Sequence, residues 1–108
     1  MEKKNSYQFF MEEAPDAANA FNGLIGSLQN VGLDVKTMQL CYIAIKASQG
    51  DATAVAAHVP MAKQAGATWD EVRGAILLTL TVSGVSGVLS CLAPAKEAYE
   101  EVVKAKKE

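Results

Sequence analysis

The sequence predicts an all-α fold of five to six helices, and three observations support this prediction. Half of the residues are hydrophobic, yet only 6% are aromatic. Strands are enriched in aromatic and β-branched residues, so an alanine-rich chain with few aromatics favours closely packed helices. Apolar residues recur at helical spacing, with glycine, proline and capping residues between the apolar runs. Because the 108 residues contain no linker and no repeat, we expect residues 1–108 to form a single domain.

The first two helices are expected on either side of Pro15. Residues 6–13, SYQFFMEE, form a short amphipathic helix, which ends because the residue before a proline is pushed out of the helical region. Pro15 suits the first turn of the next helix, which we expect to end before Gly32. The apolar residues of this second helix share one face: Ala17, Phe21, Leu24, Ile25 and Leu28.

The third helix is expected over Val35–Ser48, with Asp34 as its cap and Gly50 at its end. Its apolar residues are distributed around most of its circumference: Met38, Leu40, Cys41, Ile43, Ala44, Ile45 and Ala47. Such a helix is central or lies in a subunit interface. Since a chain of 108 residues has little core in which to bury it, we expect a stable homo-oligomer.

A fourth helix is expected between Asp51, a second capping residue, and Gly66. It carries Val55, Met61 and the only histidine of the chain, His58. Proline lacks the backbone donor that a helix interior needs, so we expect Pro60 to kink or split this helix.

The last two helices begin after residue 67. Thr68 and Glu71 form a capping box, and Trp69 in the first turn is interpreted as a packing anchor. The apolar face of this helix is formed by Val72, Ile76, Leu77 and Leu80. Residues 79–82, TLTV, alternate like a strand but are too few to outweigh the capped helical run around them. After a turn at residues 84–87, GVSG, the final helix contains Pro94 and an apolar stripe: Ala95, Ala98, Tyr99, Val102 and Val103.

Composition and patterning also argue against several classes of function. Residues 74–95 carry no charge and are long enough to cross a bilayer, but hydroxyl residues and glycines interrupt them, which favours two buried helices of a soluble protein. The net charge is −2 and no basic stripe is present, so we expect no nucleic-acid partner. Two cysteines and no signal peptide are typical of a cytoplasmic protein. We expect no metal and no cofactor, because the chain has one histidine and no phosphate-binding loop.

Two stretches together resemble a known family. GLDVKTMQLCYIAIKASQG, followed by AAHVPMAKQAGATWDEVRGAILLTLTVSGVSGVLSCLAPAKEAYEE, is similar to the carboxymuconolactone decarboxylase family, which includes the alkylhydroperoxidase D-like proteins. The resemblance covers residues 21–101. It implies a small all-α domain that assembles as a homo-oligomer, commonly a trimer or a hexamer.

The peroxidase branch of this family implies a chemistry that this sequence lacks. Its members use a Cys-x-x-Cys ahead of the histidine and a glutamate in the preceding helix. In this sequence the two thiol positions are occupied by Asp51 and Ala54, the glutamate position by Gln39 and the histidine position by His58. A peroxide-reducing thiol must ionise, and its disulfide must be resolved by a second thiol. The sequence therefore argues against this peroxidase route.

The decarboxylase branch needs no cysteine pair and keeps its histidine in a setting like AAHV. The resemblance therefore implies a cofactor-free lyase acting on a small carboxylated lactone or related acid, with His58 as acid–base residue and Gln39 facing it. Branch members hold their dicarboxylate substrate with charged residues. The cations nearest to His58 by position are Lys46, Lys63 and Arg73. At the glycine-rich turn, Gly-Val-Ser replaces the Gly-Val-Pro typical of the branch.

Other interpretations stay open. His58 can equally be a structural residue hydrogen-bonded to a neighbour, as most histidines in alanine-rich helices are. The chain would then be a non-catalytic member that binds a small ligand or only packs. Cys41 and Cys91 are each within an apolar run and are expected to be small buried hydrophobes. A peroxiredoxin-type or alkylhydroperoxidase-type reductase would instead use one of them as its thiol.

Overall fold

Every regular element in the described part of the chain is a helix. The computed structural model describes residues 5–107, with side chains through Glu101. The residues group into two compact units, one ending at Leu33 and the other beginning at Asp34. The all-α prediction is therefore confirmed for the described residues.

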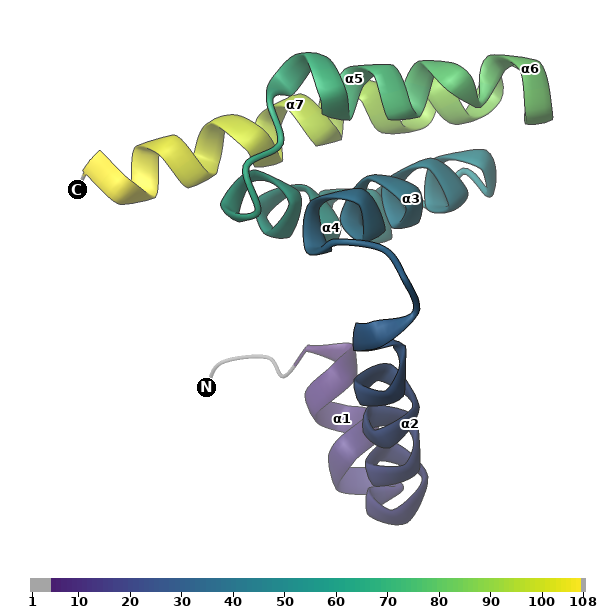
Figure 1. The fold of residues 1–108 in the computed structure, drawn as a ribbon, viewed down its shortest axis with the longest axis vertical. Coiled ribbons are helices and arrows are strands. Elements are labelled where there is room, and N and C mark those ends of the chain that lie inside the picture. The colour runs from purple at the N-terminus through teal and green to yellow at the C-terminus, as the bar shows by residue number, and fades with distance from the viewer. Residues whose placement is uncertain (1–4, 108) are drawn as a thin grey trace. The chain divides into compact units, whose positions relative to one another are not determined.

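The first unit is a pair of packed helices, α1 (Ser6–Glu13) and α2 (Pro15–Ser27), followed by the 3₁₀ turn η1 (Leu28–Asn30) (Figure 1). The Phe10 and Phe21 rings meet edge to face, with centroids 6.2 Å apart. The Tyr7 hydroxyl donates to the Asn22 side chain on the other helix. The expected second helix is shorter than predicted, because the chain tightens into η1 at Leu28 well before Gly32.

The second unit contains α3 (Val35–Ser48), α4 (Ala52–Gln64), α5 (Trp69–Leu78), α6 (Leu80–Ser83) and α7 (Ser86–Lys107). The caps are those expected from the sequence. Asp34 accepts from the Thr37 backbone N–H, and Asp51 accepts from that of Ala54. Thr68 and Glu71 form the expected capping box. The short α6 is one further turn that the sequence pattern did not indicate.

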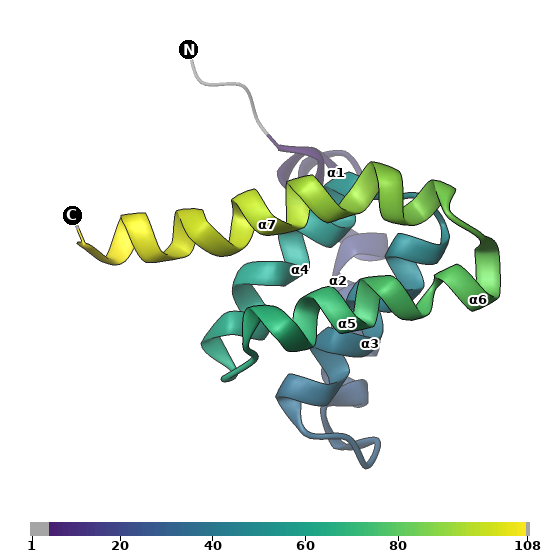
Figure 2. The same cartoon turned by 90° about the horizontal axis from the view of Figure 1, so that it is seen from above.

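The core of this unit lies where α4 packs against both α3 and α7, with α5 covering α3 and α7. Figure 2 shows α5 and α7 running side by side, joined through α6. The fully buried side chains come from all four long helices: Ile43, Ala47, Val55, Val59, Ala62, Val72, Ile76, Cys91 and Ala95. Ala98 and Tyr99 continue the stripe of α7 into this core as predicted. Val102 and Val103 lie outside the described side chains.

Three details of the second unit differ from the prediction. Pro60 does not split its helix, since α4 continues to Gln64, and α7 likewise runs through Pro94. The turn before α7 is short, and Gly87 belongs to the helix. A Cβ atom on Gly87 would lie 2.1 Å from the carbonyl oxygen of Ala47, so α7 and α3 approach backbone to backbone at this point.

Cys41 is exposed, which corrects the expectation that both cysteines are buried. The physical reason is that α3 buries one face, with Met38, Ile43 and Ala47, and leaves other apolar residues such as Ile45 at the surface. The corner formed by α5, α6 and the start of α7 is also apolar at its surface, through Leu78, Val82 and Leu89. No helix in residues 5–107 combines the length and apolar character needed to span a bilayer.

Candidate functional site

The centre of the candidate site is a contact between α3 and α4. The Nδ1 atom of His58 lies 2.8 Å from the side-chain Oε1 of Gln39. Both side chains are half-buried. The contact joins residues 19 positions apart in the sequence. The two residues that the resemblance assigned to one site are therefore neighbours in the fold.

The turn between α3 and α4 sets this contact. Gly50 takes a left-handed conformation with φ 72°, which a side chain would disfavour, and this lets the chain reverse directly after α3. Asp51 then starts α4 by capping it. Ile43 and Ala47 pack against Val55 and Val59 in the buried layer between the helices. This packing holds Gln39 and His58 opposite one another.

The partner of Nδ1 defines the tautomer of His58. The Gln39 Oε1 atom can only accept a hydrogen bond, so Nδ1 carries the proton of the neutral imidazole. Nε2 is then left as the acceptor. No hydrogen bond to Nε2 is formed within residues 5–101, where every buried side-chain nitrogen and oxygen has a partner. Nε2 therefore keeps some exposure to solvent and is free to accept a hydrogen bond.

Tyr42 fixes the ring of His58 from one face. The two rings are stacked, with centroids 5.1 Å apart and planes inclined by 27°. Tyr42 lies three residues after Gln39, so both face α4 from the same side of α3. Tyr42 is not among the residues that the sequence predicts for the site. Its i, i+3 spacing from Gln39 is the signal that would have indicated it.

The environment holds His58 in its neutral form. Burial lowers the pKa of His58 below its usual value of 6.5, because the imidazolium loses hydration, and the positive charge of Lys46 lowers this pKa further. Near neutral pH the ring is therefore uncharged, with Nε2 able to accept a proton.

Only one of the three cations near His58 in sequence is available at the site. Lys63 donates to the backbone oxygen of Tyr99 at 3.0 Å and lies over the ring of the same residue. Arg73 is paired with Asp70 at 2.9 Å. Lys46 makes no ion pair among the described side chains, and its positive charge lowers the pKa of His58.

The positions that hold thiols in the peroxidase branch have a structural role here. Asp51 Oδ1 accepts a hydrogen bond of 3.0 Å from the backbone N–H of Ala54, so the two residues form the N-terminal cap of α4. Cys91 is fully buried and Cys41 is exposed, and both are free thiols. Among the described residues, no three histidine, cysteine or acidic side chains gather in a way that could hold a metal ion.

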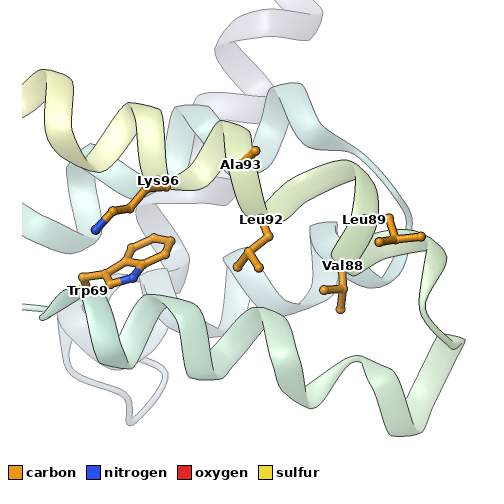
Figure 3. Close-up of a pocket in the computed structure, with 6 residues that line it drawn as sticks. All are labelled: Trp69, Val88, Leu89, Leu92, Ala93 and Lys96. Atoms are coloured by element: carbon orange, nitrogen blue, oxygen red, sulfur yellow. The ribbon is translucent and has the colours of Figure 1, made fainter.

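A separate apolar groove lies between α5 and α7, and it does not include His58. It has a volume of about 460 Å³. Figure 3 shows the Trp69 ring on the α5 side and Lys96 extending over it from α7, with the ammonium 4.7 Å from the ring centroid. The remaining lining residues are apolar and come from α7: Val88, Leu89, Leu92 and Ala93. Trp69 also contacts the core and the Tyr99 ring, as its predicted anchoring role requires.

Comparison with known protein families matches residues 12–97 to the carboxymuconolactone decarboxylase family. The chain belongs to the carboxymuconolactone decarboxylase family. Comparisons with curated proteins and with solved structures give no match. In this member of the carboxymuconolactone decarboxylase family, the imidazole of His58 is oriented by an amide where the peroxidase branch has a carboxylate. An amide cannot take up a proton, so any proton that His58 transfers must be exchanged through Nε2.

Proposed function

We propose that this chain is a cofactor-free lyase acting on a small carboxylated lactone or a related acid, with His58 as its acid–base residue. The observation that carries this proposal is the contact of 2.8 Å between His58 Nδ1 and Gln39 Oε1. Because this contact occupies Nδ1, proton transfer to and from the substrate takes place at Nε2. Membership of the carboxymuconolactone decarboxylase family supports the choice of substrate class.

The proposed reaction needs one proton delivered to carbon. Loss of CO₂ from an unsaturated lactone carboxylate breaks one carbon–carbon bond and leaves the electron pair on the lactone as a dienolate. A carbon of the dienolate then takes the proton from Nε2 of the imidazolium. The neutral imidazole regains a proton from water, so the net reaction consumes one proton. Nδ1 carries hydrogen in both forms of the ring, so Gln39 can hold the ring throughout.

His58→Gln tests the proposal, because glutamine is similar in size and keeps one hydrogen-bonding group but cannot deliver a proton near pH 7. With carboxymuconolactone as substrate, we expect CO₂ release to fall by about 100-fold or more, the usual contribution of a positioned acid–base group. The oligomer size should not change. Gln39→Leu is the matched variant, since it keeps the imidazole but removes the hydrogen bond that orients it. We expect a smaller loss of CO₂ release for this variant than for His58→Gln. A wild-type protein without turnover, or a His58→Gln variant with full activity, would refute the proposal.

A second candidate function is supported by the α5–α7 groove. Its apolar walls and the single cation Lys96 suit a small ligand with an apolar body and a negative end, which a non-catalytic member of the family would bind. A thiol-dependent reductase is the third alternative, and the exposure of Cys41 is the observation that favours it. Ligand binding that is unaffected by His58→Gln would favour the non-catalytic alternative.

We also propose that the protein is a cytoplasmic homo-oligomer, a trimer or a hexamer, built from one domain over residues 1–108. The apolar surface of α3 and of the α5–α6–α7 corner supports assembly, since monomers rarely leave such side chains uncovered. The family match spans both compact units of the chain, which supports a single domain.

A further inference from the structure

The face of α3 that meets His58 carries more than Gln39. Tyr42 follows Gln39 by three residues and Lys46 follows it by seven, a spacing that places all three on one side of the helix. Gln39 contacts the edge of the imidazole and Tyr42 covers one face of it. Lys46 lies one turn beyond Tyr42, at the end of α3 nearest to the start of α4.

Among the described side chains, Lys46 is the one cation on this face without a protein partner. Lys46 is only partly buried, so part of its surface is accessible to a ligand. Asp51, the nearest acid in the α3–α4 turn, is engaged in capping α4. On α4 itself, Lys63 is bound to Tyr99. Among residues 5–101, the other charged side chains of the helices packed against α4 are paired with one another or exposed: Lys36–Glu71, Asp70–Arg73, Lys96–Glu100, Glu97 and Glu101.

We propose that Lys46 is the carboxylate-binding residue of this site, and that an anion bound to Lys46 causes His58 to take up the proton that it later delivers. This inference rests on the proposed acid–base role of Nε2. The positive charge of Lys46 disfavours the imidazolium, and a carboxylate beside it cancels that charge and adds a favourable partner for the ring. Burial alone then opposes protonation. Substrate binding and protonation of His58 are thereby linked, so a neutral lactone would bind without causing the imidazole to take up a proton.

The single histidine of the chain makes this linkage directly measurable. The imidazole C–H signals in an NMR pH titration report the pKa of His58 and of no other residue. The probe is γ-butyrolactone-γ-carboxylate, a saturated lactone that lacks the double bond needed for decarboxylation. Its neutral counterpart, γ-butyrolactone, has the same ring without the charge. Sodium chloride at equal ionic strength controls for screening of Lys46.

We expect the carboxylate to raise the pKa of His58 by roughly 0.5–1 in the wild-type protein, and the neutral lactone to leave it unchanged. In Lys46→Met the pKa of free His58 should already be raised, and the carboxylate should shift it no further. Arg73→Met removes one exposed cation from α5, where it is paired with Asp70, and should behave as the wild type. The Nδ1-protonated tautomer should persist in all variants, because Gln39 is intact.

A wild-type titration that does not respond to the carboxylate would overturn this inference, as would an equal response in Lys46→Met. Neither result depends on turnover. A protein that shows the linked titration but releases no CO₂ would refute the proposed lyase and keep the anion site. A protein that turns over lactone, but in which the carboxylate does not shift the pKa of His58, would refute the anion site and keep the proposed lyase.

Discussion

Gly87→Ala adds a single methyl group at the closest approach of two helices. The new Cβ would lie 2.1 Å from the carbonyl oxygen of Ala47 and 3.1 Å from its carbonyl carbon. Non-bonded heavy atoms are most favourable at about 3.5–4.0 Å, so α7 must move away from α3 by about 1 Å or more. The obstructing atoms belong to the backbone, and no rotation of a side chain relieves the contact.

The loss in the free energy of unfolding follows from the contacts that this displacement of α7 breaks. Overpacking a well-packed core typically costs about 1–3 kcal/mol. Here both partners are backbone, and moving α7 also draws Val88 and Cys91 out of the core, so we expect about 3 kcal/mol or more. The higher helix propensity of alanine offsets about 1 kcal/mol at most. At about 4–8 °C per kcal/mol for a domain of this size, a net loss of about 2–3 kcal/mol lowers the Tm by roughly 8–24 °C.

Thermal unfolding followed by circular dichroism at one protein concentration measures this loss. Gly74→Ala is the matched control, because Gly74 lies inside α5 and a Cβ there would meet nothing within 4 Å. This control should be neutral or more stable than the wild type, by up to about 1 kcal/mol. If Gly87→Ala is as stable as Gly74→Ala, the close approach of α3 and α7 is wrong.

Three further predictions follow from the site and the surface. Changing both Cys41 and Cys91 to alanine should leave any lactone activity within a few-fold of the wild-type activity. The wild type should show no thiol-dependent turnover of alkyl hydroperoxides. Robust peroxidase activity that is lost in the double variant would instead favour the reductase alternative. The pKa of His58 is below 6.5 in the folded protein. As the pH falls below 6.5, the unfolded chain therefore binds more protons at His58 than the folded protein does. The contribution of neutral His58 to the free energy of unfolding is complete above pH 6.5 and is lost as the pH falls below it. Urea unfolding at pH 7.5 and pH 5 should show a larger acid loss for the wild type than for His58→Gln, and equal losses would contradict this. Light scattering at micromolar concentration should give an oligomer, because Leu78, Val82 and Leu89 are exposed by 69%, 78% and 76%; a monomer would refute the assembly.

Helix starts were predictable from the sequence because capping is a local interaction. Asp34, Asp51 and Thr68 each bond a backbone N–H three residues ahead, so both partners are visible in a short window of sequence. The end of α3 was equally local, since Gly50 takes the left-handed conformation expected after a helix.

The features that the sequence did not predict depend on partners far along the chain. Cys41 and Cys91 have similar apolar neighbours, and only the packing of α3 against α4, α5 and α7 decides which faces of α3 are covered. Gly87 resembled a turn residue, whereas its neighbour Ala47 is 40 positions away. The stacking of Tyr42 on His58 is also a contact between helices. For Gln39 and His58, spacing alone indicated nothing, and the family resemblance brought the two together.

The cap at the start of α4 also constrains how this chain can change. Asp51 and Ala54 occupy the N-cap and the third residue of the helix, joined by one hydrogen bond. A helix start is a favourable place for a thiolate, because the backbone N–H groups and the helix dipole lower the pKa of a thiol there. Replacing Asp51 by cysteine, however, loses a carboxylate cap and about 1 kcal/mol of stability. Any mutational path from this sequence to a thiol pair at these positions that starts at Asp51 therefore passes through a less stable protein before a disulfide can form. The stability that the Asp51 cap provides thus favours retention of the thiol-free site.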